Sequence, residues 1–272
     1  MRKATIIAVY NNKGGVGKST FSVNFLHSIV SQFKKDDGSK YKVLLVDNDG
    51  QSNATLTLTG KTEDEISNLD TPTIFDMIVE EDVTAKNCVT HTLYPSIDII
   101  PATDDHSDTP DAISSYMDNT RIMKEKLQSV ANEYDFIVID CAPTRDRNIY
   151  NALFAADVVI TPLETQRFSQ VGLRNLLEQI NKINKRRDTA LLHYVFLSKV
   201  DNRQKVSNQK IKNNLQSKLG DDFLDEYISL LSLYSKSFEE NLTAINYSDN
   251  RGAIEMKRLT SRILTKINEE LI

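Results

Sequence analysis

The sequence predicts an α/β fold, with a mostly parallel, twisted sheet covered by helices on both faces. Short apolar runs rich in valine and isoleucine alternate with segments of helical periodicity along the chain, and turn clusters separate them. This alternation is typical of βαβ units, whose sheets are buried on both faces. Of the 272 residues, 40% are hydrophobic and 26% are charged, as in an ordinary globular protein. With no internal repeat or Gly/Ser linker, we expect a single domain over residues 1–272.

The first half of the chain contains three apolar runs that predict buried strands, because each is short, β-branched and ended by a turn cluster. Apolar side chains at helical spacing follow the first run and predict a helix that starts near Lys18. Residues 61–130 are acidic and less regular. The predicted elements, in order, are strand 4–10, the helix from Lys18, strand 42–49, helix 73–81, strand 96–102 and helix 121–134.

The second half repeats the alternation and ends in a segment with apolar residues at helical spacing. Two apolar runs lie on either side of a short helical stretch, and a basic helix follows the last predicted strand. The predicted elements are strand 136–143, helix 148–156, strand 157–162, helix 171–184, strand 191–200, helix 206–219 and the terminal helix 252–272.

A glycine-rich loop, "NKGGVGKST", lies between the first strand and the first helix. Glycines let the backbone turn its N–H groups towards phosphate oxygens, at a helix N-terminus that also favours anions. Asn12 stands where the strict P-loop pattern has glycine, so a glycine-rich turn without ligand is the alternative. We favour a P-loop NTPase that binds ATP through Lys13, Gly14, Gly15, Val16, Gly17, Lys18, Ser19 and Thr20.

Three carboxylates follow apolar strands and suit the Mg²⁺ that such a site needs. Asp140 ends the run "FIVID", and Asp47 and Asp49 alternate at the end of "LLVDND", which puts them on one side of the chain. A strand-ending aspartate that caps the next helix is the alternative for Asp140. A solvated turn is the alternative for the other two.

The segments "KGGVGKST", "LLVDNDGQSNATL", "FIVIDCAPT" and "AADVVITPLETQRFSQVGL" resemble, in this order, the ParA/MinD family of deviant Walker ATPases. They are most similar to the short ParA-type proteins that partition plasmids and chromosomes. The resemblance runs from about residue 4 to about residue 200 and continues more loosely to the end. It implies a Mg²⁺-dependent ATPase that forms an ATP-sandwich homodimer and acts with a ParB-type centromere-binding partner.

The resemblance also implies roles for single residues. Lys13 matches the signature lysine that reaches the partner subunit's phosphates, where a cation stabilises transition-state charge. Lys18 and Ser19 match the phosphate and Mg²⁺ residues, and Asp140 matches the Walker B acid. By this pattern Lys13, Asp47 and Asp49 are catalytic, whereas Ser19, Asp47 and Asp140 hold the metal.

Two positions depart from the family pattern. Gly50 in "DNDGQ" replaces a usual proline, which could loosen the loop after the second strand. The stretch "PTRDRN" replaces a proline- or glycine-rich one and changes a surface that would face the dimer partner. Neither departure removes a group that the chemistry needs.

A net charge of −5 hides a basic segment, since residues 181–218 carry ten Lys and Arg against two Asp. A solvated helix face is the plain interpretation. The alternative is sequence-independent contact with DNA phosphates, to which a basic tail also contributes. Only about ten residues precede the glycine loop, so we expect no operator-specific DNA binding. The residues expected to contact DNA, in a basic part spanning 181–272, are Lys199, Arg203, Lys205, Lys210, Arg251, Lys257 and Arg258.

No segment has the roughly 20 apolar residues of a membrane span, and Glu269 and Glu270 at the end oppose an anionic membrane. Cys88 and Cys141 form no C-x-x-C motif, which favours a reducing compartment. We therefore expect a cytoplasmic, nucleoid-associated ATPase in DNA segregation. The rival interpretations are a relative that positions another cargo, such as a chemoreceptor or conjugation complex, and an ATP-gated regulator with little turnover.

Overall fold

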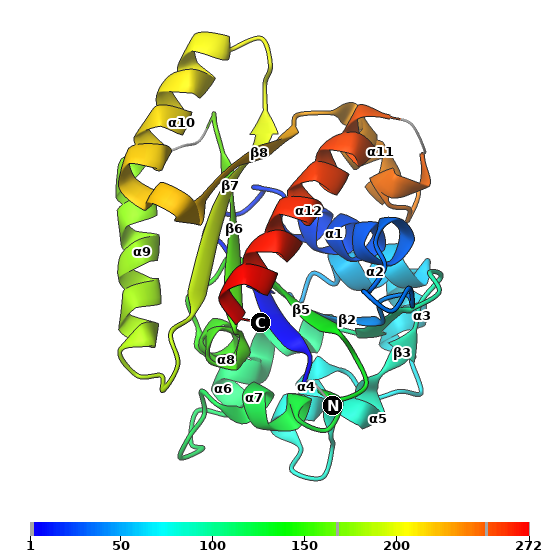
Figure 1. The fold of residues 1–272 in the computed structure, drawn as a ribbon. Coiled ribbons are helices and arrows are strands. Elements are labelled where there is room, and N and C mark those ends of the chain that lie inside the picture. Colours follow the sequence, from blue (N-terminus) through cyan, green and yellow to red (C-terminus); the bar gives the residue numbers. More distant parts are fainter. Residues whose placement is uncertain (1–2, 167–168, 248–249, 272) are drawn as a thin grey trace.

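Eight strands form one sheet in the computed structural model, which describes residues 3–166, 169–247 and 250–271 (Figure 1). The strand order is β3-β4-β2-β5-β1-β6-β7-β8, and all neighbours are parallel except β3 and β4. This confirms the predicted fold class. The strands are β1 Thr5–Val9, β2 Val43–Asn48, β3 Thr90–His91, β4 Ile97–Ile100, β5 Phe136–Cys141, β6 Val158–Glu164, β7 Leu192–Val200 and β8 Phe223–Ser229.

Helices cover both faces of this sheet, and α1 and α12 lie side by side on one of them (Figure 1). The helices are α1 Lys18–Gln32, α2 Asn53–Thr59, α3 Glu63–Ser67, α4 Ile74–Val79, α5 Ala85–Cys88, α6 Thr109–Ala112, α7 Ile122–Leu127, α8 Arg147–Ala155, α9 Gln170–Asn184, α10 Lys205–Leu219, α11 Ser232–Glu239 and α12 Arg251–Leu271, with 3₁₀ turns η1 Asp104–Asp108, η2 Gly220–Asp222 and η3 Ala244–Asn246.

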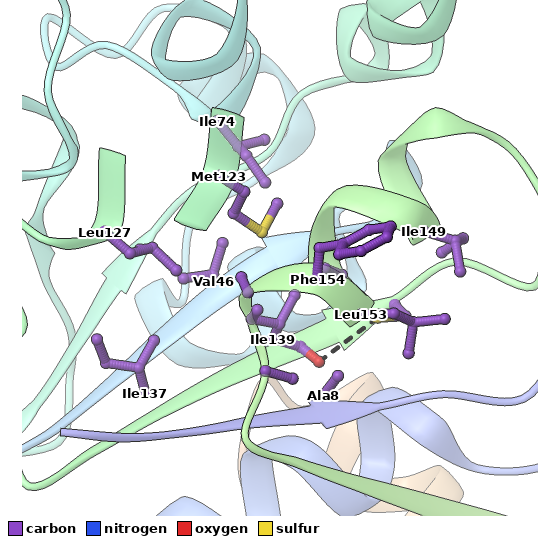
Figure 2. Close-up of a cluster of buried hydrophobic side chains, with 14 of the residues drawn as sticks. Ala8, Val46, Ile74, Met123, Leu127, Ile137, Ile139, Ile149, Leu153 and Phe154 are labelled. Atoms are coloured by element: carbon purple, nitrogen blue, oxygen red, sulfur yellow. Dashed lines mark hydrogen bonds between the residues drawn. The ribbon is translucent and has the colours of Figure 1, made fainter. Parts of the chain in front are cut away.

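The side chains of successive strand residues pack into two different cores, because side chains alternate between the two faces of a strand. In β1, Ala8 faces the core under α4, α7 and α8, whereas Ile7 and Val9 face the core under α1 and α12. Figure 2 shows the first of these cores, where Phe154 and Met123 close over the strands. Both faces are therefore apolar, which explains why the central strands read as continuous apolar runs.

The helix predicted over 121–134 is wrong in its second half, because α7 ends at Leu127. Past that residue the amides of Gln128 and Val130 bond carbonyls three residues back, which tightens the chain into turns. The carbonyl of Ala131 then accepts from the amide of Ala4, at 2.7 Å, which fixes this segment beside β1. A tertiary contact thus overrides the helical periodicity.

No sequence pattern predicted β8 and α11. Asp225 and Glu226 interrupt the apolar pattern of β8, which is tolerated because β8 is an edge strand and only β7 pairs with it. The register between β7 and β8 also shifts, so the pairing is irregular. These two elements complete the pocket described below. The single-domain organisation stays a prediction.

The sheet order explains where a ligand can bind. β1 lies between β5 and β6, and the chain leaves β1 towards β2 on one side and later reaches β6 on the other. Ligands of open parallel sheets bind beyond the carboxyl ends of the strands, where the order reverses. The glycine loop and all three predicted aspartates lie at this edge.

Candidate active site

The glycine loop connects β1 to α1 through two residues with left-handed backbones. Gly15 has φ 74° and Gly17, directly before α1, has φ 90°, conformations that cost other residues free energy. The resulting turn places the start of α1 at the end of β1, where its N-terminal dipole can attract an anion.

Three side chains fix the carbonyl groups of this loop. Lys18 Nζ donates to the carbonyl of Lys13 at 3.3 Å, and Ser198 Oγ donates to that of Val16 at 2.7 Å. Lys199 Nζ donates to the carbonyl of Gly15 at 2.6 Å. The end of β7 therefore holds the loop from one side, while Lys18 holds it from within.

The two lysines of the loop have different surroundings. Lys18 is 6% exposed, and burial lowers the pKa of its ammonium group, which the nearby carboxylate of Asp140 raises in part. Lys13 is exposed at the mouth of the loop. One lysine thus faces into its own site and the other is accessible from outside.

Asp140, the last residue but one of β5, lies directly below the first turn of α1. Its carboxyl accepts hydrogen bonds from the Ser22 hydroxyl, at 2.8 Å, and from the Ser19 hydroxyl. Its other oxygen, Oδ2, is buried and has no hydrogen-bond partner among the described residues. Because burial raises the pKa of this carboxyl despite those bonds, a cation or an ordered water would stabilise its charged form.

Asp47 lies directly opposite Asp140 in the β2–β5 pairing, and both are fully buried. Burial, followed by the charge of Asp140, raises the pKa of Asp47. The carboxylate of Asp47 accepts from the amide and hydroxyl of Thr55, at 2.8 and 2.7 Å, so it also anchors α2. Asp49 is half-buried in the following turn and acts electrostatically on Lys18.

The predicted phosphate and metal residues are thus brought together at one edge of the sheet, although their assigned roles stay predictions. The described residues contain no cluster of three or more His, Cys, Asp or Glu side chains that could hold a metal alone. A serine hydroxyl with one carboxylate and phosphate oxygens is, however, the usual way in which proteins hold Mg²⁺ beside a nucleotide.

Gly50 has a structural reason to replace proline. A Cβ atom there would collide with Ser107 Oγ and lie 3.3 Å from Ser107 N and 3.4 Å from Asp104 O. The 3₁₀ turn η1 thus presses on the loop after β2. Its His106 bonds Asn48, between the two predicted acids, through Nε2 at 2.9 Å, so this loop is fastened rather than loosened.

An apolar pocket of about 270 Å³ adjoins the phosphate loop. Gly17 and Thr20 form its boundary with the loop, and its walls come from β7, β8 and α11. A flat ring with polar edges suits such a pocket. Sequence reasoning missed it because its side chains come from distant segments: Phe21, Phe196, Ser198, Lys199, Ile228, Ser229, Leu230, Leu231, Tyr234, Ser235, Phe238 and Met256.

Six of the seven residues predicted to contact DNA are exposed at α10, α12 and the loop before α10, while Lys199, in β7, donates to the phosphate loop. Hydrogen bonds connect the loop before α10 to α12: Asn202 donates to Ser229 at 2.8 Å, and Ser229 donates to Glu255 of α12 at 2.7 Å. Glu255 also pairs with Arg251 at 2.7 Å. Two basic segments far apart in the sequence therefore lie together. The six residues are Arg203, Lys205, Lys210, Arg251, Lys257 and Arg258.

Fold and site together define a P-loop ATPase. The chain matches the family described as AAA domain over residues 4–192. It is 32% identical over 208 residues to the sporulation initiation inhibitor protein Soj of Bacillus subtilis (strain 168), covering 76% of this chain and 77% of that protein. The chain belongs to the ParA/MinD-type P-loop ATPases, in the group that contains the Soj and ParA partition proteins.

Solved structures agree with this fold. A plasmid partition protein of Borrelia burgdorferi B31 bound to AMPPNP superimposes with a TM-score of 0.79 at 22% identity, covering 97% of this chain and 100% of that chain. Cobyrinic acid a,c-diamide synthase of Mycobacterium smegmatis with ADP and magnesium gives 0.80 at 20% identity, covering 99% and 97%. Among the described residues, no helix is both long and apolar enough to span a membrane.

Proposed function

We propose that this chain hydrolyses ATP with Mg²⁺, dimerises around ATP and, in that state, binds DNA without sequence preference to drive DNA segregation. The observation that carries the proposal is the pair of lysines on one loop, with Lys18 buried beside Asp140 and Lys13 exposed at the mouth. One cation, Lys18, is enough for the phosphates of its own subunit. The exposed Lys13 would therefore act on the phosphates bound by a second subunit.

Each group of the site would have a distinct task. Lys18 would release the Lys13 carbonyl and bind phosphate, while the loop amides bind the remaining oxygens. Ser19 and the water shell of Asp140 would hold Mg²⁺, which supplies charge neutralisation at the phosphates. Asp49, half-buried near Lys18, would orient the attacking water. The apolar pocket beyond Gly17 would hold adenine.

The basic residues on α10 and α12 support the DNA-binding step. They are exposed, lie on connected elements and would be doubled by dimerisation. Binding by such a surface depends on phosphate charge and falls steeply with salt. A ParB-type partner would then stimulate hydrolysis and release the DNA, as the relationship to partition proteins suggests.

The test is binding to a duplex of arbitrary sequence across a salt series, with ATP, ADP or no nucleotide. We expect tight, salt-sensitive binding with ATP alone, and loss of that binding in Lys18→Ala. DNA binding of equal strength with ATP, with ADP and without nucleotide would refute the proposed dependence of DNA binding on ATP. Unchanged ATP turnover in Lys18→Ala would show that the site is assigned wrongly.

A further inference from the structure

A second concave site lies away from the nucleotide pocket, between α8, the end of α9 and the turn at 119–120. Its volume is about 650 Å³, within the range of ligand-binding clefts. Tyr150 and Phe154 of α8 contribute aromatic surface to its wall. We call this site the basic cleft, after the five cationic side chains that line it: Arg145, Arg147, Lys182, Lys185 and Arg186.

The charge of the basic cleft is unbalanced. Asp146 is the one acidic residue in its lining, and its carboxylate already accepts from the amide of Ile149, at 3.2 Å, as the N-cap of α8. None of the five cations forms an ion pair with another described residue. Arg147 donates to the carbonyl of Pro110 at 3.1 Å, but no carboxylate neutralises it. Cations that converge on a cavity without acidic partners favour an anionic ligand.

The cleft is formed in advance of binding. Arg187, just behind it, donates to the carbonyls of Leu153, Phe154 and Ala156 at 2.8, 2.7 and 2.6 Å. These bonds fasten the segment after α9 to the end of α8. A wall held in this way costs little ordering entropy when a ligand binds.

One side of the cleft is connected to the phosphate loop. When the side-chain amide of Asn12 is oriented with its oxygen towards Arg145, the Nε of Arg145 donates to that oxygen at 3.1 Å. The Tyr10 hydroxyl donates to the carbonyl of Thr144 at 3.1 Å. The segment that supplies Arg145 therefore touches both the end of β1 and the residue before Lys13.

We propose that the basic cleft binds an acidic segment of a partner protein, and that this segment acts on the phosphate loop by drawing Arg145 away from Asn12. Arginine and lysine pair well with carboxylates, and arginine does so in bidentate fashion. A concave site of this size suits a few peptide side chains. Duplex DNA is too wide to enter a cavity of this volume, whereas the exposed basic residues of α10 and α12 can contact its phosphates from outside. Only the effect on turnover rests on the proposed function.

The binding step can be measured by fluorescence anisotropy of labelled hexaglutamate with the full-length chain. Lys182→Glu/Lys185→Glu reverses two cleft charges outside the nucleotide site. Lys257→Glu/Arg258→Glu makes the same charge change on α12 and serves as the matched control. We expect the cleft variant to bind hexaglutamate about tenfold more weakly, which is about 1.4 kcal/mol, with the control close to wild type.

Equal losses in the two variants would show that the probe senses net charge alone, and no loss in either would show that it binds elsewhere. Both results would overturn the proposal. The same measurement with duplex DNA tests the remaining explanation, which is that the cleft belongs to the DNA-binding surface. If the cleft variant lost DNA affinity as strongly as hexaglutamate affinity, the cleft would be part of the DNA surface and the proposal would be wrong.

The coupling step is tested on ATP turnover. We expect hexaglutamate to change turnover in the wild type, and Arg145→Ala to abolish this response while retaining hexaglutamate binding through the other cations. Retention of the response in Arg145→Ala would overturn the coupling. If the wild type did not hydrolyse ATP at all, the proposed function would fail, and the anisotropy comparison would still decide on the cleft.

Discussion

Lys199 shows how one backbone conformation can decide the role of a side chain. Consecutive residues of a strand point to opposite faces, yet Ser198 and Lys199 both bond carbonyls of the phosphate loop. The left-handed φ of 50° at Lys199 makes this possible, at a cost of about 1–3 kcal/mol. The sequence predicts Lys199 as a DNA contact, which stays a prediction. Its bond to the phosphate loop could not be predicted, because no residue pattern indicates a lysine with a left-handed backbone.

Gly50 gives a direct test of the turn pressed against it. Gly50→Ala should lower the free energy of unfolding by about 1–3 kcal/mol, because the new Cβ would overlap Ser107. Gly172→Ala is the control, since its Cβ would meet Ser169 Cβ at a comfortable 3.7 Å inside α9. Urea unfolding measures both. Adding Ser107→Ala to Gly50→Ala should restore part of the loss, and equal stability of Gly50→Ala and wild type would contradict the collision.

His106 predicts a pH dependence of stability. Burial lowers its pKa to about 3, below the unfolded value of about 6.5. The native chain then binds fewer protons than the unfolded chain, so this contribution is full above pH 6.5 and is lost as the pH falls. Between pH 7 and 5 the wild type should lose about 2 kcal/mol more stability than His106→Gln, measured by urea unfolding. Parallel pH profiles for the two proteins would rule out a neutral, buried His106.

At the scale of elements, β8 connects the apolar pocket to the basic helices α10 and α12. Its end lies in the apolar pocket through Ile228 and Ser229, and α10 and α12 both pack against it. Ser229 in addition accepts from Asn202 of the loop before α10. This edge strand, which no sequence pattern predicted, is therefore the element between the apolar pocket and the basic helices. Its interrupted apolar pattern is the reason that periodicity did not reveal it.

The basic helices predict a specific salt dependence. Arg203→Ala and Lys257→Ala should each weaken ATP-dependent DNA binding across all sequences and reduce the slope of log affinity against log salt by about 1. Lys34→Ala, which removes an exposed charge after α1 and away from α10 and α12, is the control. Anisotropy of a labelled duplex at several salt concentrations measures the slopes. Slopes that match wild type in Arg203→Ala and Lys257→Ala would remove α12 and the loop before α10 from the DNA surface.

For the molecule as a whole, the sequence predicts a feature correctly where all the residues that form it lie in one segment. The glycine loop, Asp47 and Asp140 near the ends of their strands, and the strands and helices with strong periodicity all follow from local patterns. The pocket beyond Gly17, the clamp of η1 on Gly50 and the basic cleft do not, because each joins side chains from segments far apart in the chain. Such sites exist only after folding has fixed the strand order.

The proposed dimer can be tested by mixing two inactive variants. Lys18→Ala should fail to bind phosphate, and Lys13→Ala should bind ATP without turnover, since its partner would lack the second cation. In a mixture, the Lys18→Ala subunit would still offer Lys13 to the other site. Random pairing makes half of the dimers mixed with one complete site each, so turnover should recover to at most about a quarter of wild type. Activity that stays at zero would indicate that Lys13 acts within its own subunit.

The attachment of β7 to the phosphate loop has a thermodynamic consequence. Ser198 and Lys199 hold the loop that would bind ATP, and the chain continues within four residues to Arg203, which would meet DNA. If ATP raises the affinity for DNA, DNA must raise the affinity for ATP by the same factor, because the two binding free energies share one coupling term. DNA would then be an effector of the nucleotide site as much as a cargo, and a subunit on DNA would retain ATP longer than one in solution.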